Sequence, residues 1–199
     1  MATIADFRVR VKAALGIATT STERGYEDAN IDQHIKQVVE EFSIYVPAEA
    51  SADLTVIAGA RTLSTASLSR LLRVAAVEVP LSQWPRVFVD FDRWSSTLTL
   101  DLSPPSVNTT ARVYYEQTHR VDTDGSTVPP EHEHVIVEGA TAFAVLARAA
   151  GAANTLEVST PQPQTHQHLR IAQTRLEHWR IQLRRLGGRV VRRQLVVPS

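Results

Sequence analysis

The stretch that decides the fold lies near the carboxyl end, where residues 165–186 read THQHLRIAQTRLEHWRIQLRRL. Apolar residues recur in it at alternating spacings of three and four, the pattern of a helix packed lengthwise on another helix. We therefore predict a helix from Thr165 to Leu186 that ends at Gly187 and Gly188. Its packing seam is Leu169, Ala172, Leu176, Trp179, Leu183 and Leu186.

The other faces of this helix are basic, and a basic, apolar tail of residues 188–199 follows it. The helix arginines are expected to make charge contacts between subunits or with a partner; they are Arg170, Arg175, Arg180, Arg184 and Arg185. The tail is too short to bury its own apolar side chains, so we predict that it docks on a partner. The predicted docking residues are Arg189, Val190, Val191, Arg192, Arg193, Leu195, Val196 and Val197. These features favour an assembly protein over an enzyme.

Three further helices are predicted upstream. The first runs from Ala5 to Ile17, with Thr3 as N-cap and Asp6 three residues later. The second is capped by Asn30 and closed by Pro47. The third, residues 131–150, is apolar almost all round, which is typical of a helix buried on several sides. We expect Gly151 to end it and residues 152–164 to form a linker.

The chain changes character between residues 50 and 118, where Val, Thr and aromatic residues alternate with polar ones. This alternation predicts short antiparallel strands. We expect Asp92 to Ser96 to form a hairpin turn, because apolar residues alternate on both sides of it. The predicted strands are Leu54–Ala58, Leu72–Val79, Arg86–Phe91, Thr97–Leu102 and Ala111–Thr118.

Together these elements predict an α+β fold that is mainly an α-helical bundle of about four helices. An antiparallel β insertion separates its second and third helices, and an extended C-terminal tail follows the fourth. The predicted domains are a discontinuous helical domain (1–49 and 119–187), the β insertion (50–118) and the tail (188–199).

Composition excludes several classes of protein. Of 199 residues, 43% are hydrophobic, which is enough for a core, and none is cysteine. Disulfides, thiol catalysis and cysteine-bound zinc are therefore excluded. The N-terminus has charges in every turn, unlike a signal peptide, and the most apolar run, residues 139–147, is too short to span a bilayer. We expect a soluble, intracellular protein that does not associate with membranes.

The zero net charge conceals a division along the chain. Residues 1–150 carry 13 Lys and Arg against 19 Asp and Glu, whereas residues 151–199 carry 8 Arg against 2 Glu. Such a molecule can associate head to tail or place its basic end on an acidic partner. An ordinary solvated basic helix is the simpler alternative.

Histidines offer the one arrangement that resembles a metal site. His132 and His134, like His166 and His168, stand two residues apart near predicted helix starts. Residues at this spacing do not share a helix face, although in an extended segment they would, and Glu131 or Glu133 would then complete a site. We favour solvent-exposed histidines and predict no metal.

No motif for catalysis or cofactor binding is found. The pairs Asp90/Asp92 and Asp122/Asp124 lack a companion base or nucleophile and fit the wet face of a strand and a turn. The sequence contains no GxSxG, P-loop or GxGxxG, and no recognisable helix-turn-helix. We therefore predict neither an enzyme, nor a cofactor, nor sequence-specific DNA binding.

Five segments resemble the head–tail connector (adaptor) proteins of tailed bacteriophages. They are ADFRVRVKAALGI (5–17), IDQHIKQVVEEFSIYVP (31–47), LLRVAAVEVPL (71–81), ARVYYEQTHRVD (111–122) and TVPPEHEHVIVEGATAFA (127–144). The terminal helix and tail resemble those of the family in their arrangement, a C-terminal helix followed by a tail, more than in their sequence.

The resemblance implies a non-catalytic virion protein, assembled in the host cytoplasm and located in the neck between portal and tail. It implies a ring, usually of about twelve copies, that docks on the portal, extends the DNA channel and forms a platform for tail or neck proteins. The helical bodies would pack side by side, the C-terminal helix and tail would reach the portal, and contact with packaged DNA would be nonspecific. The alternative is an intracellular DNA-associated or regulatory adaptor that uses the Arg-rich helix.

Overall fold

The computed structural model describes residues 2–18, 26–81, 83–156 and 163–190, with the backbone alone for 152–156, 163–168 and 188–190. The chain divides into two compact units. The helical unit comprises Met1–Val46 and His119–Ser199, and the β unit comprises Pro47–Thr118. Each unit has its own hydrophobic core.

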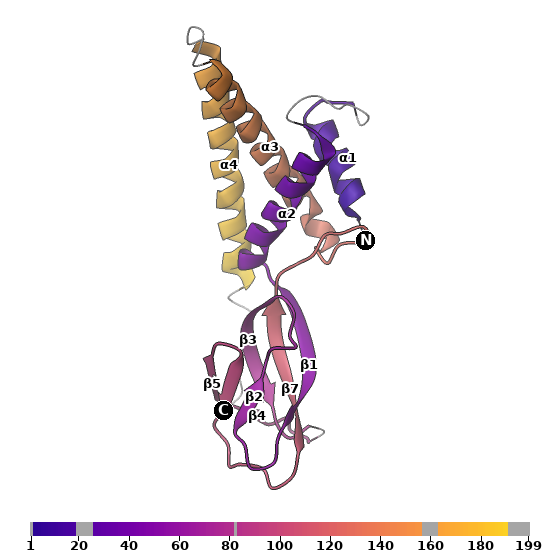
Figure 1. Ribbon diagram of the computed structural model, residues 1–199, viewed down its shortest axis with the longest axis vertical. Helices are drawn as coiled ribbons and strands as arrows, with labels where there is room; N and C mark the ends of the chain where they lie inside the picture. Colours follow the sequence, from indigo (N-terminus) through magenta and orange to yellow (C-terminus); the bar gives the residue numbers. More distant parts are fainter. Residues whose placement is uncertain (1, 19–25, 82, 157–162, 191–199) are drawn as a thin grey trace. The chain divides into compact units, whose positions relative to one another are not determined.

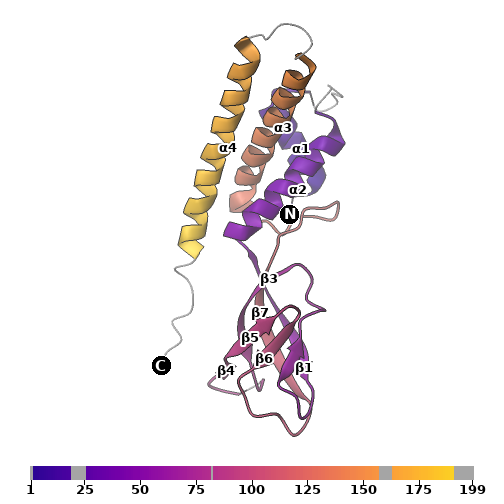
Figure 2. The same ribbon diagram turned by 60° about the vertical axis from the view of Figure 1, so that its left-hand side comes forward.

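The helical unit is built around α3 (Glu133–Leu156), which follows the short 3-10 helix η1 (Pro130–His132). Three helices pack on α3: α1 (Ile4–Ala14), α2 (Asp28–Tyr45) and α4 (Pro163–Val190). Figures 1 and 2 show α4 running alongside α3 over most of its length, with α2 crossing them. The largest fully buried side chains of this unit are Trp179, Phe7, Phe42, Ile31, Ile35, Ile136 and Leu183.

The starts of the first two helices differ in how well they were predicted. The cap of α1 is confirmed: the Asp6 amide donates to Thr3 Oγ1, and the Thr3 amide donates to the Asp6 carboxylate at 2.8 Å. For α2 the predicted cap is wrong, because the helix begins at Asp28, three residues before its first buried residue, Ile31, and has Glu27 at the N-cap. Asn30 lies inside the helix, and its amide donates to Glu27 Oε2.

Glycine does not end α3 or α4 as predicted. α3 continues through Gly151 to Leu156, and α4 continues through Gly187 and Gly188 to Val190. A glycine inside a helix costs only about 1 kcal/mol relative to alanine, so packing overrides it. Gly187 shows such packing, because a Cβ there would lie 3.2 Å from both Cδ1 and the carbonyl oxygen of Tyr45.

The β unit consists of two antiparallel sheets that enclose a small core. The first sheet has the order β1-β7-β3-β4, formed by Ala48–Val56, Thr109–Gln117, Leu71–Glu78 and Phe88–Val89. The second has the order β2-β6-β5, formed by Thr62–Ser64, Thr97–Leu100 and Phe91–Trp94. The core residues are Val56, Leu63, Leu68, Val77, Val79, Leu98, Leu100, Ala111 and Val113.

Three strand predictions require correction. The strand predicted at Leu54 begins at Ala48, and β2 was not predicted. The single strand predicted over 86–91 is divided, with β4 in one sheet and β5 in the other. The predicted hairpin is confirmed between β5 and β6, with a narrower turn at Ser95 and Ser96, since Trp94 pairs with Thr97.

The prediction of a mainly α-helical bundle is wrong. The described part of the chain contains four α helices and also seven strands, which form two antiparallel sheets. The fold is α+β with a substantial β unit. The error arose in the β region, where polar, alanine-rich residues 48–53 pair with β7 throughout although their types favour strands weakly.

Candidate functional site

The seam of α4 packs against α3 through Trp179, which is fully buried. Its indole Nε1 donates to the carbonyl oxygen of Val135 at 2.9 Å, and its ring meets Phe143 edge-on at 5.9 Å. Leu176 and Leu183 are buried with it, whereas Leu186 and Leu169 are partly exposed. The seam residues therefore hold α4 within its own helical unit.

Gly139 makes this close packing possible, and sequence reasoning overlooked it. A Cβ on Gly139 would lie 2.5 Å from Cε2 of Trp179, closer than any real carbon contact. A lone glycine inside an otherwise apolar helix is a known signal of close approach. That signal was present in the sequence and points to the α3–α4 contact.

The α4 arginines fall into two groups. Arg180 is partly buried and pairs with Glu41 of α2 at 2.8 Å. The others are exposed and form no ion pair with any residue that the structure describes; they are Arg170, Arg175, Arg184 and Arg185. Arg180 thus fastens α4 to α2, and the remaining arginines present free positive charge.

The predicted docking tail falls mostly outside the described residues. Arg189 and Val190 belong to the last turn of α4 rather than to an extended segment. Val191, Arg192, Arg193, Leu195, Val196 and Val197 lie outside the described part of the chain. Their docking role therefore stays a prediction.

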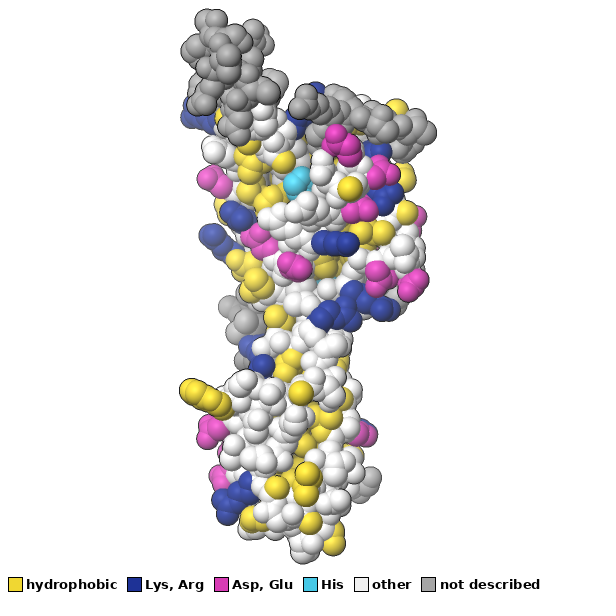
Figure 3. All heavy atoms as spheres, viewed as in Figure 1, with side chains coloured by type: hydrophobic (Ala, Val, Ile, Leu, Met, Phe, Trp, Pro, Cys, Tyr) yellow, Lys and Arg dark blue, Asp and Glu magenta, His cyan; other side chains and the backbone are white. Residues whose placement is uncertain are grey.

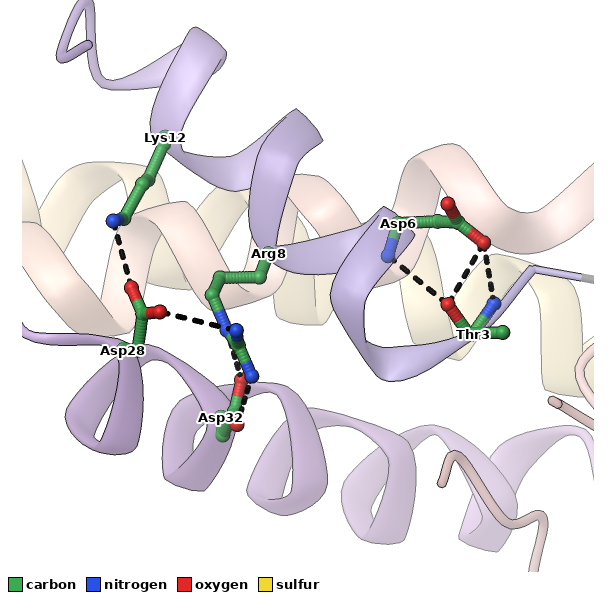
Figure 4. A network of polar contacts seen from close by, with 6 residues as sticks. All are labelled: Thr3, Asp6, Arg8, Lys12, Asp28 and Asp32. Atoms are coloured by element: carbon green, nitrogen blue, oxygen red, sulfur yellow. Dashed lines mark hydrogen bonds and ion pairs between the residues drawn. The ribbon is translucent and has the colours of Figure 1, made fainter. Parts of the chain in front are cut away.

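A network of charges joins α1 to α2 (Figure 4). Arg8 donates two hydrogen bonds to Asp32 and one to Asp28, at 2.6–3.1 Å. Lys12, which is buried, lies 2.7 Å from Asp28. The hydrogen bond from Lys12 and the Arg8 guanidinium lower the pKa of Asp28. These contacts fix the packing of the first two helices.

His119 ties together the two places where the chain leaves and re-enters the helical unit. Its Nε2 lies 3.0 Å from the carbonyl oxygen of Val46, so this nitrogen carries the proton and donates. Its backbone amide donates to Ser43 Oγ, which in turn donates to the Val39 carbonyl. The ring packs at 5.4 Å from that of Phe42. This buried arrangement is structural.

A groove of about 360 Å³ opens on the helical unit, with α3 as its floor and α1 and α4 as its walls. Most of the surface that lines it is apolar. Its lining residues are Arg10, Ala14, His134, Val137, Glu138, Thr141, Ala142 and Arg175. Arg10 forms an ion pair with Glu133 at 2.6 Å, whereas Arg175 forms none with any described residue. The Glu138 carboxylate also lines the groove, and its neighbour His178, 3.7 Å away, is charged only if protonated.

Apolar side chains stand exposed on both units. On the helical unit the most exposed is Ile44 at the end of α2, 69% accessible, and smaller fractions of Val9, Ile171 and Ile181 are exposed. On the β unit Trp84 and Trp94 are 91% and 87% exposed. Figure 3 shows acidic and basic side chains interspersed over the helices, and mostly uncharged surface on the β unit. Contiguous apolar patches mark interaction surfaces, whereas apolar side chains exposed singly are ordinary on a protein surface.

The histidine pairs do not form a metal centre in the described residues, where no group of three His, Asp or Glu is placed to hold an ion. His132 packs at 5.7 Å from the Phe42 ring, and His134 lines the groove. The side chains of His166 and His168 lie outside the described set.

The aspartate pairs lie in different units. Asp90 and Asp92 border a shallow hollow with Arg61, Thr99 and Asp101 on the β unit. Asp122 accepts hydrogen bonds from the amides of Asp124 and Gly125, as expected of a turn.

Among the residues that the structure describes, one helical stretch, Pro130–Gly151, is long and apolar enough to cross a membrane by length and composition. Its most apolar 18-residue window has a mean hydropathy of 1.2, and 44% of that window is buried inside the packed helical unit. A core helix meets the same criterion.

Comparison with known proteins gives little. No family model matches the sequence, and no curated protein matches it. Among solved structures, a chain from "Neck of empty GTA particle computed with C6 symmetry" is similar, with 9% sequence identity and a TM-score of 0.30. The match covers 72% of this chain and 80% of that chain. Similarity of this extent establishes neither family nor function.

Proposed function

We propose that this chain is a structural, non-catalytic component of a bacteriophage neck. In this role it is a head–tail connector (adaptor) that forms a ring on the portal, extends the DNA channel and carries tail or neck proteins. It acts in the virion, between capsid portal and tail, after assembly in the host cytoplasm.

The observation that carries the proposal is where the five connector-like segments fall. They form α1, α2, the start of α3 and the paired strands β3 and β7, which are the central elements of the two units. The resemblance therefore follows the framework of the fold rather than scattered surface positions.

The surfaces left free on this framework also support an assembly role. The helical unit has exposed arginines on α4, an apolar groove and an exposed Ile44, all of which are available for contact with neighbouring subunits. A ring needs two different, complementary faces on each subunit, and these features supply candidates for both.

The decisive experiment places the purified chain together with the portal of the same phage. We expect native mass spectrometry and electron microscopy to show a portal-bound ring of about twelve copies. A chain that remains unbound in the presence of this portal contradicts the proposal.

A DNA-associated adaptor is the second candidate, favoured by the exposed Arg170, Arg184 and Arg185 on α4. Contacts of this kind are made to phosphates and weaken steeply with salt. Fluorescence anisotropy with a random-sequence duplex at two salt concentrations tests it. Micromolar binding at physiological salt without portal binding favours this candidate over the connector.

A further inference from the structure

We propose that the two free edges of the first sheet pair with each other between neighbouring copies of this chain. In this arrangement β1 of one copy accepts the β4 edge of the next copy, residues 86–89, as an added antiparallel strand. The inference rests on the proposed function and deepens it, because it names the two surfaces through which ring subunits meet.

The outer side of β1 is open. This strand pairs with β7 through all nine of its residues without a bulge, and no described residue bonds to the backbone on its other side. Natural edge strands of this length are commonly shielded by lysine, proline or a bulge, and β1 has none of the three. Its only charges are the acids Glu49 and Asp53. An open edge of this kind is suited to the addition of a strand.

The same hydrogen-bond analysis identifies which backbone groups of β1 face this open side. The Thr118 amide donates to the Arg70 carbonyl at 3.0 Å, so the even-numbered residues of β7 face β3 and its odd-numbered residues face β1. The odd-numbered residues of β7 oppose the even-numbered residues of β1. The backbone groups of Glu49, Ser51 and Asp53 therefore point away from the sheet.

The β4 edge is the opposite border of the same sheet (Figure 2). The Val79 amide donates to the Val87 carbonyl at 3.1 Å, so the backbone groups of Val87 face β3. Because pairing alternates along an antiparallel strand, the backbone groups of Arg86 and Phe88 face outward. Neither residue forms a backbone hydrogen bond with any described residue.

Strand direction allows these two edges to join in a ring. Each strand in the order β1-β7-β3-β4 is antiparallel to the next, so β1 and β4 run in opposite directions. A rotation that carries one copy to the next along the sheet preserves strand direction, and β4 of one copy then meets β1 of its neighbour in antiparallel orientation. Closure leaves no free edge. Pairing of β1 with β1 would instead stop at a dimer.

Charge favours a second copy as the occupant of the β1 edge. Asp53 is already paired within the sheet, whereas Glu49 forms no ion pair with a described residue and lies opposite Glu116. Arg86 on the β4 edge also forms no ion pair with a described residue. It lies on the same face of the sheet, since it donates to the hydroxyl of Tyr114, two positions from Glu116 on β7. The two borders of one sheet therefore carry complementary charges.

Apolar side chains also favour the pairing. Trp84, Val87 and Phe88 are 91%, 41% and 42% exposed, and their closeness along the chain makes them a patch beside the β4 edge rather than isolated residues. On β1, Ala50 and Ala52 are partly exposed. Their small side chains leave room for larger ones on an added strand.

One register satisfies these features together. With Arg86 of one copy opposite Ser51 of the next, its guanidinium reaches the diagonal Glu49, and Phe88 lies opposite Glu49. A shift by two residues in one direction places Phe88 beyond the start of β1. A shift by two in the other direction places Asp90 opposite Glu49, where like charges repel. A shift by one turns every side chain to the wrong face.

A charge exchange tests the contact. Glu49→Arg and Arg86→Glu, made separately, should each lower the self-association constant at least about tenfold in sedimentation equilibrium, because each places like charges together. The double variant should restore association, and so should an equimolar mixture of the two single variants, in which each altered edge meets a complementary one. Asp101→Arg is the matched control, since Asp101 is an exposed acid of the same unit outside both edges and its replacement should change nothing.

Because the chain has no cysteine, the contact can also be captured directly. In the proposed register Ala50 lies opposite Val87, and neither directs its backbone groups at the other. Such pairs have Cα atoms about 4.5 Å apart, which suits a disulfide. Ala50→Cys and Val87→Cys proteins, mixed at about 1 mM and oxidised, should yield a heterodimer in excess of either homodimer. Ala50→Cys mixed with Val107→Cys, which is 67% exposed but outside both edges, should not.

Four results overturn the inference. They are a double variant that fails to restore association, no heterodimer between positions 50 and 87, a wild type that shows no self-association up to about 1 mM, and association that Glu49→Arg abolishes but Arg86→Glu leaves unchanged. The last result would assign the β1 edge to a different partner.

The proposed function has a separate readout. A portal-bound ring that is indifferent to the charge exchange removes only this interface. Edge pairing between copies that never bind the portal removes only the connector role.

Discussion

Gly139 of α3 lies against the indole of Trp179 of α4 with no room for a methyl group between them. A Cβ at this position would be 2.5 Å from Cε2 and 2.7 Å from Nε1 of the indole. The absence of a side chain on Gly139 therefore sets the distance between α3 and α4. The hydrogen bond from Nε1 to the Val135 carbonyl fixes the ring in that space.

Gly139→Ala should destabilise the protein by about 1–3 kcal/mol, because the overpacked methyl outweighs the helix propensity gained. Gly151→Ala is the matched substitution on the same helix, where a Cβ meets nothing within 4 Å. It should be stabilising by up to about 1 kcal/mol. Urea denaturation of both variants measures the change in the free energy of unfolding. Equal changes in the two variants would contradict the close contact between Gly139 and Trp179.

Trp179→Ala should cost roughly 3–5 kcal/mol, because it empties a fully buried site and removes the indole hydrogen bond. Chemical denaturation measures the loss. A cost below about 1 kcal/mol would mean that the α4 seam does not pack against α3 in solution.

Ser43→Ala should cost about 1–3 kcal/mol, since it leaves the buried amide of His119 without its acceptor. Thr174→Ala provides the control. The Thr174 hydroxyl also donates to the carbonyl four residues earlier, but it is exposed, and its removal should be close to neutral. The melting temperatures of the two variants measure the difference. A similar decrease in both would contradict a special structural role for the Ser43 hydroxyl.

Asp28→Asn should lower stability at pH 7 by about 1 kcal/mol, a value limited by the exposure of this carboxylate. Lys12 and Arg8 lower its folded-state pKa below the ordinary 3.8, so the stabilisation is full above that value and is lost as pH falls through the folded-state pKa. Wild type and variant should therefore converge once the pH has fallen below the folded-state pKa of Asp28. Glu40→Gln, on the same helix but without an ion pair to described residues, should show no such pH-dependent difference.

Deleting residues 191–199 should leave the melting temperature nearly unchanged and abolish attachment to the portal. Several Val and Leu side chains docked on a partner contribute roughly 1.5–3 kcal/mol each before ordering costs. Differential scanning calorimetry and portal pull-down give the two readings. If the shortened chain unfolds, residues 191–199 belong to the core of the protein itself. If it attaches normally to the portal, these residues are not the docking element.

Helix positions in this chain were predictable where local chemistry decides them. The Thr3–Asp6 cap depends on only four residues of sequence, and the α4 seam is indicated by the spacing of its apolar residues. Helix ends were not, because tertiary contacts decided them. Gly187 stays helical against Tyr45, and α2 begins early at Asp28, whose carboxylate is held by Lys12 and Arg8.

Strand predictions failed for a different reason. β1 draws its strand character from pairing with β7 rather than from its own alanines and acids. At Asp90 the chain passes from β4 in the first sheet to β5 in the second. The alternation of apolar and polar residues over 86–91 does not reveal such a change of sheet. The groove was equally invisible, since it combines residues of three helices that lie far apart in the sequence.

The link between His119 and Val46 has a consequence for how such a chain can evolve. Because the imidazole bridges the exit and the return of the backbone at 3.0 Å, the helical core continues past the β unit almost without interruption. The β unit between them, Pro47–Thr118, is therefore an insertion whose length or sequence can change during evolution without changes in the helical core. We therefore expect related chains to differ most in the β unit and to share the same helical unit.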